Sequence, residues 1–258
     1  MGGRAVRKGV NPRGGRREGL GGEQIEGRRA VLELLHAQTR PVREVLLARG
    51  ETDDEIEALA FEAGARVRHV SEVQLEAEAR SAAPQGVIAY AAPLAEADAD
   101  ELLNDPAAFL VALDGVTDPG NFGAILRTAE SAGATGVIVP KQRSARVTPT
   151  VAKAAAGAIE HLPLAPVPGI PAFLERAKRA GVWSVGLDER GESSLFDLSL
   201  ADAPLVIVMG AEGRGLAALT KKRCDLLVNI PMRGHVESLN VSAAAALACF
   251  EVARRRLG

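Results

Sequence analysis

The sequence predicts an α/β protein with a mostly parallel sheet, and three features lead to this fold class. Two strand-like apolar runs, Val206–Met209 and Leu226–Ile230, each end in a polar loop that contains glycine. A helical pattern follows each loop, and five apolar strands alternate with helices in the C-terminal part of the chain. Strands without polar alternation are typical of a parallel sheet that helices cover on both faces. The carboxyl ends of such strands form a crevice that can bind a ligand.

A basic tail is predicted over residues 1–22, ahead of the first folded unit. It holds six basic groups, one acid and many glycines, and such low hydrophobicity favours disorder. Its local charge of +5 leaves −7 on the rest of a chain whose total is −2. Two interpretations stay open for the tail: an electrostatic tether to RNA, or a solvated extension.

Residues 23–92 alternate between helical and strand patterns, which indicates a compact α/β module. Gly64 stands just past one expected helix, and Ser71 stands in the N-cap position of the next. The expected helices are Gly27–Leu35, Asp53–Ala63 and Glu72–Ala79, and the expected strands are Val42–Leu47, Val67–Val70 and Gly86–Ala91. Residues 93–106, rich in Ala and Asp, are predicted to form a linker.

The second domain is predicted over residues 107–258. The run Asp118-Pro119-Gly120-Asn121 predicts a turn in which Asn121 caps a helix over Phe122–Ser131. Thr148 is expected to cap a single helix that reaches about Glu160. The other expected elements are the strands Phe109–Leu113, Gly136–Val139 and Val182–Leu187, and helices over Pro171–Ala180, from Leu216, and from Asn240 or Ser242.

Composition and motifs exclude several classes of function. Cys224 and Cys249 are far apart and outside any Cys/His cluster, which argues against a zinc site or a disulfide scaffold and suits a reducing cytosol. No apolar run is long enough to span a membrane. The chain has no Walker motif, and the glycine spacing after Met209 is not that of a dinucleotide site. Aromatic residues make up 3%, so RNA contacts would depend on charge and shape more than on base stacking.

Three stretches read together resemble motifs 1, 2 and 3 of the TrmH/SpoU branch of the SPOUT RNA methyltransferases. They are NFGAILRTAESAG from Asn121, IVMGAEGRGL from Ile207 and IPMRGHVESLNVSAAAAL from Ile230. Their order and spacing agree with the family over about Ala107–Leu257. The opening IEGRRAVLELL of the first module is similar to the substrate-binding domain of the ribosomal RNA 2′-O-ribose subgroup. The resemblance therefore implies a SPOUT fold whose C-terminal segment forms a deep trefoil knot, preceded by a small α/β substrate-binding domain.

The same resemblance implies a homodimer, RNA as partner and S-adenosylmethionine as cofactor, and the unclustered cysteines predict no metal site. Gly210, Ile230, Met232 and Leu239 match the cofactor-binding positions. Gly210 is expected to let the backbone approach the ligand where a Cβ would collide. Packing at a strand end is the alternative for Ile230, and the small residues of the last helix suit either a dimer contact or an internal core.

Five polar residues match the family's catalytic positions: Arg127, Asn121, Glu212, Ser238 and Asn240. A ribose 2′-hydroxyl is a poor nucleophile when neutral, so the site must remove its proton or stabilise the developing alkoxide. Because a guanidinium stays protonated, Arg127 is expected to stabilise charge and hold the target phosphate, with proton acceptance left open. The structural alternatives are an ion pair between Arg127 and Glu130, a helix cap by Glu212, and an N-cap by Asn240.

The sequence thus predicts a cytosolic RNA 2′-O-ribose methyltransferase that acts on a guanosine of 23S ribosomal RNA. Other substrates within the family stay open, namely transfer RNA or another ribosomal nucleotide, including one whose methylation confers resistance. A non-catalytic ribosome-assembly factor with the same fold is the alternative from a different class. A nicotinamide-dependent oxidoreductase is a third possibility that the glycine spacing disfavours.

Overall fold

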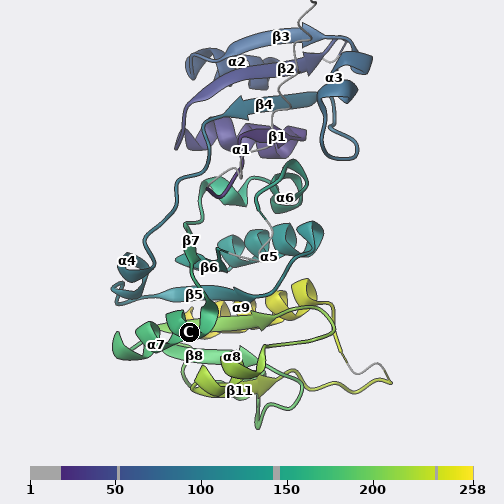
Figure 1. Ribbon diagram of the computed structural model, residues 1–258. Coiled ribbons are helices and arrows are strands. Elements are labelled where there is room, and N and C mark those ends of the chain that lie inside the picture. The colour runs from purple at the N-terminus through teal and green to yellow at the C-terminus, as the bar shows by residue number, and fades with distance from the viewer. Residues whose placement is uncertain (1–18, 51–52, 142–145, 236–237, 258) are drawn as a thin grey trace, which may run out of the picture.

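The computed structural model describes residues 19–50, 53–141, 146–235 and 238–257. Two α/β units are stacked end to end, with the N-terminal unit at the top of Figure 1 and the C-terminal unit below it. The basic tail predicted over residues 1–22 falls mostly outside the described residues. Its last residues pack against the folded protein: Leu20 is buried, and Gly22 N donates a backbone hydrogen bond to Val147 O. The prediction of disorder was therefore wrong for residues 19–22.

The N-terminal unit is a four-stranded sheet in the order β1-β4-β2-β3 with three helices. Strands β2 and β3 run parallel, and the other two pairs are antiparallel. Ser71 and Gln74 form a reciprocal capping box at the start of α3, as its sequence position predicts. The elements are β1 (Gln24–Glu26), α1 (Arg28–Ala37), β2 (Val42–Ala48), α2 (Asp54–Glu62), β3 (Arg66–Val70), α3 (Glu72–Glu78) and β4 (Val87–Ala91).

The C-terminal unit is a fully parallel seven-stranded sheet in the order β7-β6-β5-β10-β8-β11-β9. Its strands are β5 (Phe109–Asp114), β6 (Gly136–Pro140), β7 (Leu164–Val167), β8 (Trp183–Leu187), β9 (Ser193–Ser194), β10 (Leu205–Gly210) and β11 (Leu226–Asn229). Its helices are α5 (Pro119–Ser131), α6 (Pro149–Ala155), η1 (Ala158–Glu160), α7 (Ile170–Arg179), η2 (Leu195–Asp197), α8 (Ala218–Arg223) and α9 (Val241–Arg256). The predicted mostly parallel α/β sheet is confirmed.

The central strands β5 and β10 are buried on both faces, which explains their continuous apolar sequence. Phe109, Val111 and Leu113 share one core with α5, α6 and α9, whereas Leu110 and Ala112 share the other with α7. Successive side chains of a strand point to opposite faces, so one strand supplies both cores. The first core continues into the N-terminal unit through α1, whose Leu34 and Leu35 are fully buried.

Between the two units, the residues predicted to form a linker include a short helix, α4 (Ala99–Leu103). Leu103 is buried in the core beside α7, and Ala97 donates a backbone hydrogen bond to Leu164 O. Contacts between α1 and η1 and between β1 and α6 hold the units together directly. The stretch from β4 to β5 therefore runs along the C-terminal unit and packs against it.

Several predicted helix boundaries differ from the structure, and those of α5, α6 and α8 are as follows. Asp118 caps α5 by accepting from Asn121 N at 2.7 Å, so Asn121 lies inside the first turn. The helix capped by Thr148 ends at Ala155, because Ala156 and Gly157 take left-handed conformations before η1. The helix expected from Leu216 begins at Ala218. Asn240 does cap α9, accepting from Ser242 N at 2.8 Å.

Candidate functional site

The site is built where β5 and β10 end side by side, with Gly210 in register with Asp114. A Cβ on Gly210 would lie 2.1 Å from Gly215 C and 2.3 Å from Leu216 N. The loop itself therefore requires a glycine here, because the close approach is between two parts of the same loop, and the expected approach of a ligand at Gly210 stays a prediction. The absence of a side chain lets the chain fold back immediately after the strand.

The loop that follows is closed by its own backbone. Ala211 N donates to Gly215 O at 3.1 Å, and Gly215 N donates to Ala211 O at 2.8 Å. Gly213 and Gly215 have φ angles of +73° and +63°, a region that glycine enters without steric cost. This tight loop presents two exposed charged side chains, Glu212 and Arg214, at the ends of the central strands.

Glu212 meets residues from the two other motifs in what we call the amide–carboxylate cluster: Asn121, Glu212 and Asn240. Asn121 Nδ2 donates to Glu212 Oε2 at 2.9 Å. Asn240 Nδ2 donates to Asn121 Oδ1 at 3.0 Å and to Glu212 Oε1 at 3.4 Å. The structure thus brings together three of the five predicted catalytic residues, which are 28 to 119 positions apart in the chain.

Helix capping was the alternative role for both Asn240 and Glu212, and the structure supports it for Asn240 only. Asn240 is both N-cap of α9 and member of the cluster, because its Oδ1 serves the helix while its Nδ2 serves the cluster. Glu212 does not cap α8. Asp114 is near the start of that helix instead, and its Oδ2 accepts from Ala217 N at 2.8 Å.

A small cavity of about 130 Å³ contains the cofactor positions predicted on the third motif. Ile230, Met232 and Leu239 line it together with Ser238. Met232 and Leu239 are 40% and 38% exposed, which is unusual for large apolar side chains unless a ligand or partner covers them. These walls fit a flat, mostly apolar group such as an adenine ring.

Asp188 lies on the same cavity and was missed in the sequence analysis. Burial raises the pKa of its carboxyl, but a hydrogen bond from Lys221 and one from the backbone of Arg190 outweigh burial and lower the pKa overall. The result is an ionised acceptor beside apolar walls, which suits ribose hydroxyls. Its position directly after an apolar strand was the signal in the sequence.

Arg127 lies apart from the cluster. It is exposed and lines a different cavity of about 300 Å³, together with Arg29, Glu33 and His161. It makes neither a hydrogen bond nor an ion pair among the described residues, so the pairing with Glu130 is absent there. Arg127 lies six positions after Asn121 along α5, which turns the two side chains to different faces of the helix.

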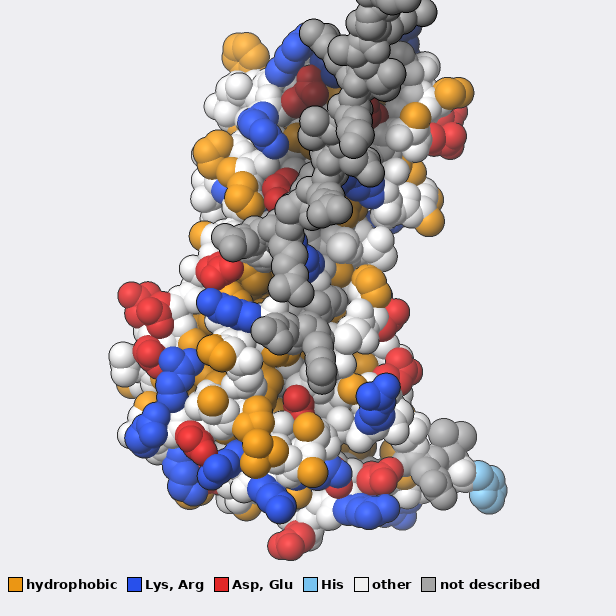
Figure 2. Space-filling model, in the orientation of Figure 1, with side chains coloured by type: hydrophobic (Ala, Val, Ile, Leu, Met, Phe, Trp, Pro, Cys, Tyr) orange, Lys and Arg blue, Asp and Glu red, His pale blue; other side chains and the backbone are white. Residues whose placement is uncertain are grey.

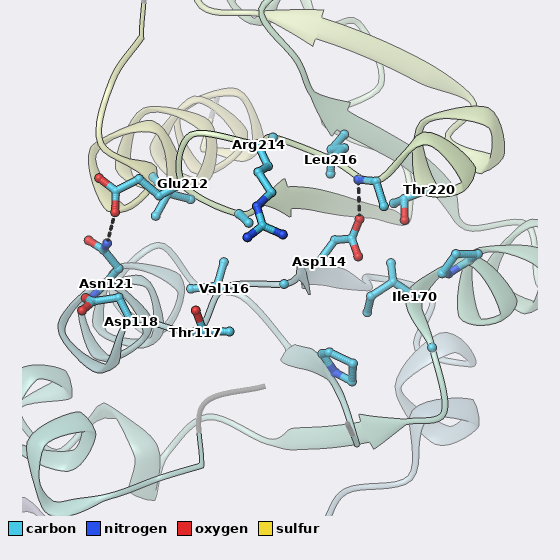
Figure 3. A pocket seen from close by; sticks show the side chains of 18 of the residues that line it. Asp114, Val116, Thr117, Asp118, Asn121, Ile170, Glu212, Arg214, Leu216 and Thr220 are labelled. Carbon is cyan, nitrogen blue, oxygen red and sulfur yellow. Dashed lines mark hydrogen bonds between the residues drawn. The ribbon is translucent and has the colours of Figure 1, made fainter. Parts of the chain in front are cut away.

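A larger cavity of about 690 Å³ is lined by the loop that follows β10, by the residues after β5 and by the start of α7 (Figure 3). Asn121 and Glu212 stand at one end of it, and Asp114 and Thr220 stand at the other. Asp114, Arg214 and Thr220 were not among the predicted site residues. Only the position of Asp114 after a buried strand and of Arg214 in a glycine loop could have indicated them.

Metal and thiol chemistry find no support in the described part of the chain. No group of three or more His, Cys, Asp or Glu is placed there to hold a metal ion. Burial raises the pKa of both Cys224 and Cys249 to about 12, so neither thiol is a nucleophile at neutral pH. Over the same residues, no helix is long and apolar enough to cross a membrane.

Comparisons with known proteins identify the family of both units. Residues 108–250 match the model of the SpoU rRNA Methylase family, and residues 24–97 match the family model for RNA 2′-O ribose methyltransferase substrate binding. A 23S rRNA (guanosine-2′-O-)-methyltransferase RlmB of Pseudomonas putida is 41% identical over 242 residues, which cover 91% of this chain and 97% of that one. The Haemophilus influenzae protein of the same name is 41% identical over 92% of this chain and 99% of its own.

A solved structure of a SpoU methyltransferase also matches this chain. The SpoU methyltransferase AviRb of Streptomyces viridochromogenes, in complex with AdoMet, matches with a TM-score of 0.78 and 28% identity, covering 91% of this chain and 90% of that one. Both units of the fold are included in that coverage. The chain therefore belongs to the SpoU rRNA methylase family, as an RNA 2′-O-ribose methyltransferase that uses S-adenosylmethionine.

Proposed function

We propose that this protein methylates the ribose 2′-oxygen of a guanosine in 23S ribosomal RNA. The observation that carries the proposal is the amide–carboxylate cluster, in which one residue from each of the three motifs is held by hydrogen bonds of 2.9 to 3.4 Å. The relatives named for the guanosine of 23S rRNA are similar over both units of the chain. A cytoplasmic location follows from the proposed substrate.

Ile230, Met232 and Leu239 are proposed to hold the adenine of S-adenosylmethionine in the 130 Å³ cavity, with Asp188 accepting from its ribose. Gly210 is proposed to contribute backbone at the turn of the motif 2 loop. The cofactor supplies a sulfonium methyl group that a nucleophilic oxygen can displace. Ser238 lines this cavity and lies two positions before Asn240 of the cluster.

Glu212 is proposed to act as a positioning residue for the ribose hydroxyl. Its two oxygens already accept from Asn121 and Asn240, which fix the carboxylate at the rim of the larger cavity. A fixed acceptor can orient the hydroxyl for attack without the cost of reorganising at the moment of reaction. Ser238 and Asn240 are proposed to complete the polar wall around the reacting oxygen.

Arg127 is proposed to stabilise the developing alkoxide and to bind the target phosphate from a second copy of the chain. Within one chain its side chain faces the cavity at the junction of the two units, not the cluster. In a homodimer, Arg127 of one chain would supply a positive charge to the amide–carboxylate cluster of the other chain. The outer face of α9 supports such a dimer, because Leu247 and Phe250 are 39% and 51% exposed there.

The deep trefoil knot is also proposed. The chain passes from β8 to β9 and η2 before it enters β10, yet β11 lies between β8 and β9. Residues 188–204 therefore pass around the strand that precedes the C-terminal helix. Arg256 at the end of α9 donates to Ala201 O at 2.8 Å and to Ala203 O at 2.9 Å, which ties the helix to this loop.

The experiment is methyl transfer from labelled S-adenosylmethionine to ribosomal RNA that lacks the modification. Wild type is compared with Arg127→Ala and with Arg179→Ala, an exposed arginine at the end of α7 that serves as the charge-matched control. We expect one 2′-O-methylguanosine in 23S rRNA, at least a hundredfold slower with Arg127→Ala and unchanged with Arg179→Ala. Removing a preorganised charge contact of this kind costs about 10²–10³ in rate.

Other outcomes separate the alternatives. Methylation of transfer RNA alone would overturn the substrate and leave the chemistry standing, and a relative from Bacillus subtilis is named a putative tRNA/rRNA methyltransferase. No transfer to naked RNA or to precursor particles, despite cofactor binding, would favour the assembly factor.

A further inference from the structure

The 690 Å³ cavity has no role in cofactor binding as proposed above, yet it opens beside the cluster. Asn121 and Glu212 belong to its lining as well as to the cluster. In Figure 3 the cavity extends from these two residues, past Val116 and Thr117, to Asp114, Thr220 and Ile170. Its volume is within the range of about 300–1,000 Å³ that is typical of small-molecule sites. A nucleoside can therefore enter it with its ribose at the cluster.

Two unlike charges face this space. Arg214 extends from the closed loop with its guanidinium above Val116, and it makes no hydrogen bond or ion pair among the described residues. Asp114 uses its Oδ2 to accept from Ala217 N, which leaves Oδ1 available as an acceptor. The cavity therefore offers several donors on one side and a carboxylate oxygen on another.

Thr220 supplies a second, independent observation. It is 0% exposed, lines the cavity, and its hydroxyl is the buried side-chain polar atom without a hydrogen-bond partner in the described part of the chain. A buried hydroxyl without a partner destabilises the folded protein, so such atoms are rare unless a ligand or water satisfies them. The hydroxyl points toward the space between Asp114 and Ile170 (Figure 3).

The walls between these polar groups are apolar. Val116 and Leu216 are buried, and Ile170 closes the far end at the start of α7. Enzymes that do chemistry on a base extrude it into a pocket that stacks it between aromatic or apolar side chains and reads its Watson–Crick edge with hydrogen bonds. The cavity combines apolar walls with polar groups in this way.

We infer that this cavity takes the base of the acceptor nucleotide and selects guanine through Asp114, Arg214 and Thr220. The inference rests on the proposed function. The N1–H and N2 amino groups of guanine donate to the Asp114 carboxylate, and its O6 and N7 accept from Arg214. Adenine presents a lone pair at N1, which would face the carboxylate without a proton. Asn121 and Glu212 then hold the ribose, between this cavity and the one that takes the cofactor.

Three substitutions test the site with RNA fragments that carry the guanosine mapped for wild type, or inosine or adenosine in its place. Arg214→Ala is expected to lower kcat/KM for guanosine by about 10- to 100-fold, since a bidentate base contact is worth about 1–3 kcal/mol. Inosine lacks the N2 amino group, so wild type should lose about tenfold on it. Asp114→Asn should remove that tenfold difference and narrow the preference for guanosine over adenosine, while its amide oxygen still accepts from Ala217 N.

Thr220→Val distinguishes a ligand contact from a structural role. It removes an unpartnered buried hydroxyl and keeps the shape, so the thermal midpoint should stay the same or rise while KM for the RNA rises by about tenfold. A purely structural threonine would lower the midpoint and leave KM unchanged. All three variants should bind S-adenosylhomocysteine within about twofold of wild type by calorimetry, since their side chains are outside the cofactor cavity. Arg179→Ala is the charge-matched control.

The measurements distinguish failure of the guanine pocket from failure of the proposed methyltransferase activity. Wild type that methylates the mapped guanosine, with three variants that retain its kcat/KM and base preference, would overturn the base pocket alone. Wild type that methylates adenosine and guanosine equally would do the same. Wild type that transfers no methyl group to any RNA would overturn the proposed function and this inference with it.

Discussion

Arg40 of the N-terminal unit and Glu160 of the C-terminal unit form a two-point ion pair that water scarcely reaches. Arg40 Nε lies 2.9 Å from Glu160 Oε2, and Nη2 lies 2.6 Å from Oε1, with side chains 6% and 0% exposed. Arg40 Nη1 also donates to Gly22 O at 2.7 Å and to Ala92 O. One guanidinium thus joins the segment before β1, the end of β4 and the C-terminal unit.

Glu160→Leu should destabilise the fold by about 3–5 kcal/mol, because it leaves the Arg40 guanidinium buried without its counter-charge. The double variant Arg40→Met with Glu160→Leu should recover much of this loss, since no charge is then buried. Chemical denaturation measures both. The control is Arg28→Ala, which breaks an ion pair with Asp53 in which the Arg28 side chain is 48% exposed, and it should cost at most about 1 kcal/mol. A Glu160→Leu variant as stable as wild type would contradict the role of the pair.

Asn240→Ser separates the two functions of Asn240. Serine caps helices about as well as asparagine, so the free energy of unfolding should change by less than about 0.5 kcal/mol. Serine lacks the amide that donates to Asn121 and Glu212, so methyl transfer should fall at least tenfold. Asn240→Ala is the comparison that loses both functions. Equal activity of wild type and Asn240→Ser would show that Asn240 serves only as a cap.

Gly210→Ala and Gly213→Ala place the same methyl group at two points of one loop. At Gly210 the Cβ would meet backbone at 2.1 Å, which forces the loop open, whereas at Gly213 nothing lies within 4 Å. Gly213→Ala should therefore cost only about 1 kcal/mol, from its positive φ. Gly210→Ala should cost more and weaken S-adenosylhomocysteine binding at least tenfold by calorimetry. Similar effects of the two substitutions would refute the steric explanation.

Much of this fold could be predicted because local signals and global architecture agree. The buried strands β5 and β10 are continuous apolar runs, and the caps Ser71, Thr148 and Asn240 stand where the helices begin. Asn121 shows where local reasoning failed. It resembles a cap at the sequence level, but Asp118 accepts the hydrogen bond because Pro119 can occupy the first helical position.

The site was only partly predictable, since it depends on which segments meet. The motifs indicated Asn121, Glu212 and Asn240, and the structure joins them by hydrogen bonds. No sequence pattern shows that Asp114 faces the same cavity as Arg214 and Thr220, because each comes from a different element. The spacing along one helix already indicates that Arg127 and Asn121 lie on different faces, but only the fold shows which face of α5 meets the cluster.

Phe250→Asp tests the proposed homodimer. Phe250 is 51% exposed on α9, and a charge in a buried apolar interface would be costly, so the variant should elute and scatter light as a monomer. Methyl transfer should fall with it, because Arg127 would no longer reach the second copy. Phe61→Asp is the matched control on α2, where the phenyl ring is 84% exposed. A monomeric wild type, or a dimeric Phe250→Asp, would refute this interface.

The stability of α9 should depend on pH through Glu251. Hydrogen bonds from Arg254, opposed by desolvation and reinforced by Arg255, lower the pKa of Glu251 to about 2 from an ordinary value of 4.5. Arg254 Nε and Nη2 each donate to the Glu251 carboxylate at 2.9 Å, and Arg255 Nε donates to it at 2.6 Å. Because the folded pKa is below the unfolded one, the unfolded chain binds more protons between these pH values. The stabilisation is therefore complete above about pH 4.5 and is lost as pH falls toward 2.

Glu251→Gln should lower the free energy of unfolding by about 1–2 kcal/mol at neutral pH, a value reduced by screening because the Arg254 side chain is 67% exposed. The difference from wild type should shrink as the pH falls through the window between about 4.5 and 2. Urea denaturation at a series of pH values measures it. Glu62→Gln, at an exposed position without an ion pair among the described residues, is the control and should show no such trend. A difference between wild type and Glu251→Gln that stays constant from pH 7 to pH 2.5 would show that the arginines do not stabilise the ionised carboxylate.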